Sequence, residues 1–243
     1  MTPLSEGDLD AIVDGAHVYP AVFEQVPGYQ VLLVVASGLR GGPSDESSDA
    51  ALRRAEQAAT VRLAGAAPES LPEVAAWREA FLSFGAKPRQ ARSSVEALLR
   101  RVDAGLPRIN RLTDLYNALS IEHLLPVGGE DLDHYVGPPR LVVASGDESF
   151  DTVTDGEATI VSPEPGEIVW RDDRGVTCRR WNWRQCVRTR LTEDTVNGLF
   201  IFDGLAPLPP DSLRAAGDAL VETLRADSPD LLVRSRLLTG VHP

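Results

Sequence analysis

Residues 109–120 have the sequence Ile109-Asn110-Arg111-Leu112-Thr113-Asp114-Leu115-Tyr116-Asn117-Ala118-Leu119-Ser120. Asn110 is of a residue type that commonly caps a helix, because its side-chain oxygen can accept a hydrogen bond from a free backbone N–H of the first turn. Apolar side chains then recur at helical spacing, at positions i, i+3, i+4 and i+7. These are Leu112, Leu115, Tyr116 and Leu119. The stretch therefore predicts a short helix with one buried face.

Helix signals also precede this stretch. Residues 50–64 are rich in strong helix formers. Ser70 followed by Glu73 has the pattern of a capping box, in which the two side chains cap each other's backbone, and Ser93 followed by Glu96 repeats that pattern. The first half of the chain is therefore expected to be mainly helical.

The second half has a different pattern. Short runs rich in β-branched residues are separated by Gly, Asp and Pro, which is typical of strands joined by turns. These runs are 141–144, 159–162, 167–170, 176–180 and 198–203. An earlier apolar run at 29–36 predicts a buried strand, and residues 211–225 predict a final helix. Because helices are grouped before strands rather than alternating with them, we expect an α+β fold.

The run from Cys178 to Leu191 holds five arginines, two tryptophans and no carboxylate in a chain of formal charge −12. Guanidinium groups pair with phosphate and indoles offer stacking faces, so the run predicts a site for an anionic, ring-containing ligand. The candidate binding residues are Arg180, Trp181, Asn182, Trp183 and Arg184. The alternative is a half-buried strand in which the tryptophans are core and the arginines are solvated. In a strand the arginines and Asn182 would point one way and the tryptophans the other.

Composition limits the classes of function. The chain has 243 residues, of which 43% are hydrophobic and 25% charged, as is ordinary for a soluble globular protein. Its longest apolar run, residues 31–36, is too short to cross a bilayer, and the acidic N-terminus lacks the parts of a signal peptide. A cytoplasmic location without a membrane partner is therefore expected. Lys87 is the only lysine among 24 basic residues, which favours a GC-rich bacterial genome.

The cysteines and the overall charge argue against other classes. Cys178 and Cys186 form no CxxC pair and have no Cys/His cluster nearby, so we expect reduced thiols, no metal site and no cofactor. A pI near 4.8 argues against broad coating of nucleic acid. DNA is therefore not an expected partner, and any contact with RNA should be local.

Three ordered segments resemble one family. They are residues 92–101, 109–120 and 125–131, and residues 179–197 continue the pattern. They resemble the B3/B4 domain of the phenylalanyl-tRNA synthetase beta subunit, and most closely its freestanding relatives. The resemblance covers about residues 75–205, so we expect one domain over 1–243, with a family-like core at 75–205 and a C-terminal helical extension at 206–243. It implies a β-sandwich core of unusual topology flanked by helices.

The resemblance also implies a function. In the synthetase the domain is an editing module that hydrolyses the ester of a mischarged aminoacyl-tRNA carrying tyrosine. The implied partner is tRNA, or the 3′ end of an aminoacyl-tRNA, and the implied activity is that of an aminoacyl-tRNA hydrolase. Because such an ester is already activated, a water held in line and donors placed where the oxyanion develops could suffice. The chain has no recognisable catalytic, anticodon or ATP motif of a synthetase, so ligation is not expected.

Individual residues match the family's motifs. Asp114 and Asn117 match an Asp-x-x-Asn segment, Pro126 and Asp131 match a Pro and an Asp, and Thr195 and Asn197 match a Thr-x-Asn segment. The resemblance thus implies catalytic roles for Asn117 and Asp131 and substrate binding by Asp114, Gly128, Thr195 and Asn197. The alternative is that Asn117 and Asp131 cap buried backbone where the helix meets the sheet.

The departures from the family matter as well. Gly128 stands where the synthetase domain usually carries a histidine, and the glutamate that reads the tyrosine hydroxyl has no counterpart, with Val187 near its place. Two functions therefore stay open: a freestanding editing esterase, or a non-catalytic module that binds RNA or a small amino-acid-like ligand. Glu130 and Asp131 are expected in a solvated loop, and Cys186 is expected to be packed and inert.

Overall fold

The computed structural model describes residues 2–87, 89–209 and 211–240, and it has an α+β fold. The helices are α1 (Glu6–Gly15), α2 (Pro20–Gln25), α3 (Glu46–Leu63), α4 (Pro72–Ser83), α5 (Ser94–Leu99), α6 (Arg111–His123) and α7 (Ser212–Asp227). The strands are β1 (His17–Val18), β2 (Gln30–Ser37), β3 (Val127–Asp131), β4 (Arg140–Val143), β5 (Phe150–Thr154), β6 (Glu157–Val161), β7 (Ile168–Arg171), β8 (Val176–Arg179), β9 (Arg184–Gln185), β10 (Asn197–Gly204) and β11 (Leu232–Thr239). The expected α+β class is confirmed.

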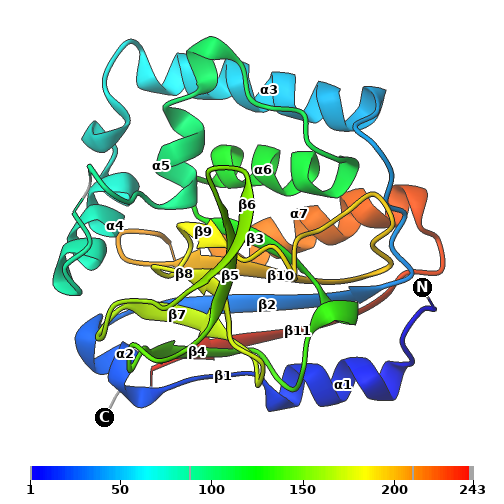
Figure 1. Ribbon diagram of the computed structural model, residues 1–243. Coiled ribbons are helices and arrows are strands. Elements are labelled where there is room, and N and C mark those ends of the chain that lie inside the picture. Colours follow the sequence, from blue (N-terminus) through cyan, green and yellow to red (C-terminus); the bar gives the residue numbers. More distant parts are fainter. Residues whose placement is uncertain (1, 88, 210, 241–243) are drawn as a thin grey trace.

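A four-stranded antiparallel sheet in the order β11-β2-β10-β3 lies at the centre of the molecule. β2 and β10 are apolar along most of their length and almost wholly buried, because helices cover one face and a second sheet covers the other. Figure 1 shows α6 and α7 above this sheet, with α3 as an outer layer over α6. A Cβ on Gly217 would lie 2.5 Å from a methyl of Leu32, so this glycine allows the close approach of α7 to β2.

The second sheet has five strands in the order β1-β4-β7-β8-β9, and β5 and β6 form a separate hairpin. Leu141, Ile168 and Trp170 on its inner face share one apolar core with the central sheet. A smaller cluster that includes Phe150 and Val169 lies outside that core. The protein is thus a β-sandwich-like core flanked by helices.

Two of the three expected helix caps form. Asn110 Oδ1 accepts from the N–H of Thr113 at 2.9 Å and Ser93 Oγ accepts from the N–H of Glu96 at 3.4 Å. The capping box expected at Ser70 is wrong, because Ser70 ends a 3₁₀ turn (Pro68–Ser70) and its hydroxyl donates to the carbonyl of Ala67. α4 begins instead at Pro72, whose fixed φ suits the first turn of a helix.

Other segments are more ordered than expected. The loop expected around Glu130 and Asp131 is instead strand β3, and α1 and α2 lie within the first 28 residues. The extension expected to be helical contains α7 and also β11, which pairs with the whole length of β2. Residues 1, 88, 210 and 241–243 of the expected domain lie outside the described residues. Within the described part of the chain, no helix is long and apolar enough to span a membrane.

Candidate functional site

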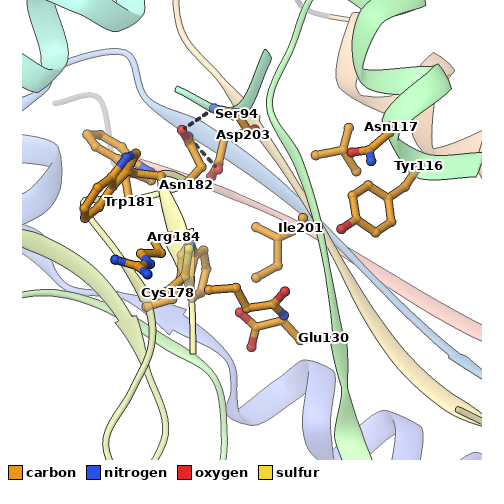
Figure 2. Close-up of a pocket in the computed structure, with 15 residues that line it drawn as sticks. Ser94, Tyr116, Asn117, Glu130, Cys178, Trp181, Asn182, Arg184, Ile201 and Asp203 are labelled. Carbon is orange, nitrogen blue, oxygen red and sulfur yellow. Dashed lines mark hydrogen bonds between the residues drawn. The ribbon is translucent and has the colours of Figure 1, made fainter. Parts of the chain in front are cut away.

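A cavity of about 160 Å³ lies between α6, β3, β10 and the turn that joins β8 to β9 (Figure 2). A cavity of about 150 Å³ can hold benzene. The cavity is therefore large enough for one ring and too small for a whole nucleotide. Six of the residues proposed from the sequence line it: Asn117, Gly128, Trp181, Asn182, Trp183 and Arg184.

Helix α6 supplies Tyr116 and Asn117 to the cavity. Asn117 is 9% exposed, and its side-chain amide forms no hydrogen bond with any described residue. It therefore does not cap buried backbone, and its amide is available to a ligand or to water. The ring of Tyr116 fits because residue 129 is glycine: a Cβ there would lie 2.8 Å from Cε1 of Tyr116.

Strand β3 supplies Gly128 to the cavity wall. A Cβ built on Gly128 meets no atom within 4 Å, and its φ is outside the left-handed region. A side chain at this position would therefore extend into free space. Gly128 stands where the family resemblance would place a histidine, and the glycine leaves that volume open.

The run of arginine and tryptophan residues is not one strand, contrary to expectation. β8 ends at Arg179, and the chain reverses at Arg180 and Trp181, whose φ angles are +46° and +65°. Trp181 is fully buried, with its ring perpendicular to those of Tyr29 and Trp77. The expected alternation of inward and outward side chains therefore does not apply, because a turn interrupts the strand period.

Trp183 lies at the rim of the cavity between two guanidinium groups. The centre of its ring is 4.6 Å from Cζ of Arg180 and 5.9 Å from Cζ of Arg184. Arg184 is exposed and donates to the carbonyl of Val153. This rim combines a stacking face with a solvent-exposed cation.

Two carboxylates that flank β7, Glu167 before it and Asp172 after it, neutralise much of the expected basic patch. Arg179 forms a two-bonded pair with Glu167, at 2.9 and 2.7 Å, and Arg180 lies 3.7 Å from the same carboxylate. Arg188 forms a two-bonded pair with Asp172, at 2.8 and 3.0 Å. The five arginines of residues 178–191 suggested a free charge of +5, because the carboxylates that pair with them lie earlier in the sequence.

Asp203 is one of two buried carboxyl groups that line the cavity and that were not among the candidate site residues. It is 1% exposed, and it accepts hydrogen bonds from the Tyr29 hydroxyl at 2.6 Å and from Asn182 Nδ2 at 3.1 Å. Asn182 in turn accepts from the N–H of Ser94 at 3.4 Å, as the dashed lines in Figure 2 show. Burial raises the pKa of Asp203 to about 6. A lone carboxylate in the apolar run 198–203 was a signal that could have identified it.

Glu130 is the second such carboxyl group, and it is 2% exposed rather than solvated as expected. The Tyr135 hydroxyl donates to its Oε2, which is the one hydrogen bond to this carboxyl from the described residues. Burial raises the pKa of Glu130 to about 7, against the lowering effect of the hydroxyls of Tyr135 and Thr177. The group therefore changes charge near neutral pH.

The other proposed residues lie outside the cavity lining and hold the scaffold together. Asp131 is fully buried and accepts from the Thr195 hydroxyl at 2.6 Å and from the N–H of Asp133 at 3.0 Å. Asn197 donates to Asp133 at 2.9 Å. Asp114 accepts from the N–H of Ile109 at 2.9 Å, just before α6. These bonds fix the ends of β3, β10 and α6.

The remaining chemical candidates are not assembled into a site. Cys186 is fully buried, and burial raises the pKa of its thiol to about 11, so it stays protonated at neutral pH. Among the described residues, no group of three His, Cys, Asp or Glu side chains could hold a metal ion.

The fold and the cavity define an α+β domain with a pocket of single-ring size. Residues 76–222, more than half of the chain, match the model of the B3/4 domain family, and the chain belongs to that family. Among solved structures it is similar to an N-terminal fragment of the phenylalanyl-tRNA synthetase beta subunit from Pyrococcus horikoshii, with 15% identity and a TM-score of 0.45. That alignment covers 90% of this chain and 50% of the fragment. No curated protein matches the sequence.

Proposed function

We propose that this protein binds an aminoacyl group, with the amino acid's side chain in the cavity. One observation supports this most directly: Asn117 of α6, Gly128 of β3 and the turn 181–184, which come from three separate family segments, converge on one cavity. A volume of about 160 Å³ suits a single side chain. The nearby amide and backbone groups can bind the polar part of the same ligand.

We also propose that the 3′ end of a tRNA carries this aminoacyl group. Membership of the B3/4 family supports a tRNA-related role, and the rim formed by Trp183 and Arg184 offers a stacking face beside a cation. Because Arg179, Arg180 and Arg188 are held by carboxylates, the contact should be local. A cytoplasmic location and a bacterial source belong to this proposal, and neither DNA nor a membrane does.

Binding can be tested with adenosine that carries an amino acid at its 3′ position through an amide, which does not hydrolyse. A panel of such compounds is titrated calorimetrically into the wild-type protein and into Gly128→Leu. The leucine fills open space in the cavity, so at least one compound should bind the wild type and lose at least tenfold in affinity with the variant.

Gly7→Leu is the matched control, because Gly7 is exposed on α1 and its φ also lies outside the left-handed region. It should bind as the wild type does. If no compound binds the wild type, or if Gly128→Leu binds them equally well, the proposal is wrong.

A second candidate function is hydrolysis of the aminoacyl ester. The amide of Asn117, buried and without a partner at the cavity, supports this because it can orient a water or bind the ester carbonyl. Asp131 would act only by positioning β3, since its carboxylate is bonded to Thr195.

Hydrolysis is measured as deacylation of a panel of labelled aminoacyl-tRNAs by the wild type, by Asn117→Ala and by Gln90→Ala. Gln90 is exposed outside the cavity and serves as the matched amide control. Rapid deacylation of one species, lost only in Asn117→Ala, would establish the activity. No deacylation at saturating protein would leave a binding function alone.

A further inference from the structure

We infer that the cavity receives a protonated amine, and that Glu130 is the residue that binds it. This inference rests on the proposed function and names the chemical group of the ligand. It follows from the polar and aromatic side chains of the cavity and from the hydrogen bonds that they leave unmade.

Glu130 is an acidic group of the cavity that has no cationic partner among the described residues. Its carboxyl is 2% exposed, lines the cavity and has no Lys, Arg or His within ion-pair distance among the described residues. Tyr135 donates to Oε2, whereas no described residue donates to Oε1. A carboxylate that is 2% exposed keeps little contact with water, so a ligand that donates a charged N–H to Oε1 would stabilise it.

Asp203 adds a second acidic group to the same cavity. Both of its oxygens already accept a hydrogen bond. Asp203 therefore adds negative charge to the cavity and offers the ligand no free hydrogen-bond acceptor. In Figure 2, Asp203 and Glu130 approach the cavity from different sides. The one basic residue among the lining side chains is Arg184, which is exposed at the rim. The inner part of the cavity therefore favours a cation.

Aromatic rings complete this environment. Tyr116, Trp170 and Trp181 line the cavity together with the two carboxyl groups. Ammonium groups are attracted to aromatic rings, and cages of such rings recognise alkylated amines. Trp183 is already flanked by Arg180 and Arg184, so it belongs to the outer rim.

The charge state of Glu130 makes binding of an amine depend on pH. Burial and Asp172 raise the pKa of Glu130, and Tyr135, Thr177 and Arg188 lower it. The other titratable or charged groups that line the cavity are Asp203, whose pKa is about 6, Arg184 at the rim, and Tyr116 and Cys178, which are protonated at neutral pH. Because the pKa of Glu130 is about 7, the carboxyl becomes ionised between pH 6 and 8. A simple alkylamine or a lysine side chain stays protonated over that range, so its affinity should rise with pH.

The test compares 2-phenylethylamine, which is charged, with 2-phenylethanol, which has nearly the same shape and is neutral. Binding is followed by tryptophan fluorescence and calorimetry at pH 6 and pH 8. The amine should bind the wild type at least tenfold more tightly than the alcohol at pH 8, and this preference should shrink at pH 6.

Two sources of the amine are distinguished by two further probes. Phenylalaninamide carries only an α-amine, and Nα-acetyl-lysinamide carries only a side-chain amine. Tighter binding of the first assigns the cavity to the α-amino group of an aminoacyl ligand. Tighter binding of the second assigns it to a basic side chain. Either result supports the inference, and equal binding of Nα-acetyl-phenylalaninamide and phenylalaninamide, with no binding of the lysine compound, overturns it.

Glu130→Gln keeps the shape and removes the charge, so it should abolish the preference for amine over alcohol. Glu157→Gln, on the exposed part of β6, is the matched control and should keep that preference. If the alcohol binds the wild type as well as the amine at both pH values, this inference is wrong while the proposed function stands. If neither compound nor any aminoacyl-adenosine binds, both are overturned.

Discussion

Neighbouring residues of β3 have different surroundings. Side chains of a strand alternate between its two faces. Gly128 and Glu130 accordingly lie at the cavity, whereas Gly129 packs against Tyr116 and Asp131 bonds to Thr195. Glu130 was expected to be solvated because a loop was expected here, and Asp131 was proposed as catalytic from the family resemblance. The alternation appears only once the strand is recognised.

Substitution of Asp131 should lower the stability of the protein without weakening ligand binding. Asp131→Ala leaves the Thr195 hydroxyl buried without its acceptor and also removes the acceptor of the Asp133 N–H, which should cost roughly 1–3 kcal/mol of unfolding free energy. Urea denaturation measures this loss. The folded fraction should bind the aminoacyl-adenosine as the wild type does, and a selective loss of affinity at unchanged stability would place Asp131 at the ligand instead.

Asn117 and residues 181–184 could be chosen as candidates from the sequence, because a family segment marks each of them, although the turn at 180–181 was not predicted. Asp203 and the role of Glu130 could not be predicted in this way. Their importance comes from burial, which depends on β10 and β3 being covered by other elements. Similarly, the charge of the arginine run depends on Glu167 and Asp172, which only the fold brings close.

At the scale of elements, the sequence predicts a helix best where a capping residue or an apolar stripe sets its position without distant segments of the chain. Asn110 caps α6 as expected, and its Nδ2 also donates to the carbonyl of Leu191 at 3.0 Å. Strand β11 could not be predicted, since its burial pattern lacks alternation and its pairing with β2 spans most of the chain.

Asn110→Ala should destabilise the protein by about 1–2 kcal/mol, because the first turn of α6 loses its cap and Leu191 loses a donor. Asn110→Ser retains a capping oxygen and should recover part of this loss. Both values come from urea denaturation. Equal stability of the alanine variant and the wild type would show that α6 does not depend on this cap.

The contact between α7 and β2 gives a second prediction for an element. Gly217→Val should lower the unfolding free energy by roughly 1–3 kcal/mol, because any Cβ at this position would overlap a methyl of Leu32. Thermal unfolding monitored by circular dichroism measures the change. Gly7→Val on exposed α1 controls for the cost of valine in a helix, and an equal effect at both positions would contradict the close packing.

At the scale of the whole molecule, two buried carboxyl groups make stability depend on pH. Glu130 and Asp203 have folded pKa values of about 7 and about 6, above their unfolded values of 4.5 and 3.8. Between these limits the folded state binds more protons than the unfolded state, so stability decreases as pH rises. Their contribution is complete below about pH 4 and is lost once pH exceeds the folded pKa values.

The unfolding free energy should therefore fall from pH 5 to pH 8, by a few kcal/mol at most. Glu130→Gln should flatten this dependence and should be more stable than the wild type at pH 8. Urea denaturation at several pH values provides the measurement. A stability that is level across this range in the wild type would mean that neither carboxyl titrates as the fold implies.

The central claim is that an aminoacyl group occupies the cavity, and the tryptophan indoles report this directly. Of the four tryptophans, Trp170, Trp181 and Trp183 line the cavity, whereas Trp77 does not. Indole N–H signals are recorded by NMR while the amide-linked aminoacyl-adenosine is added. We predict that the three cavity signals shift in proportion to occupancy and that the Trp77 signal moves least. Saturable binding that leaves those three signals in place would contradict the claim.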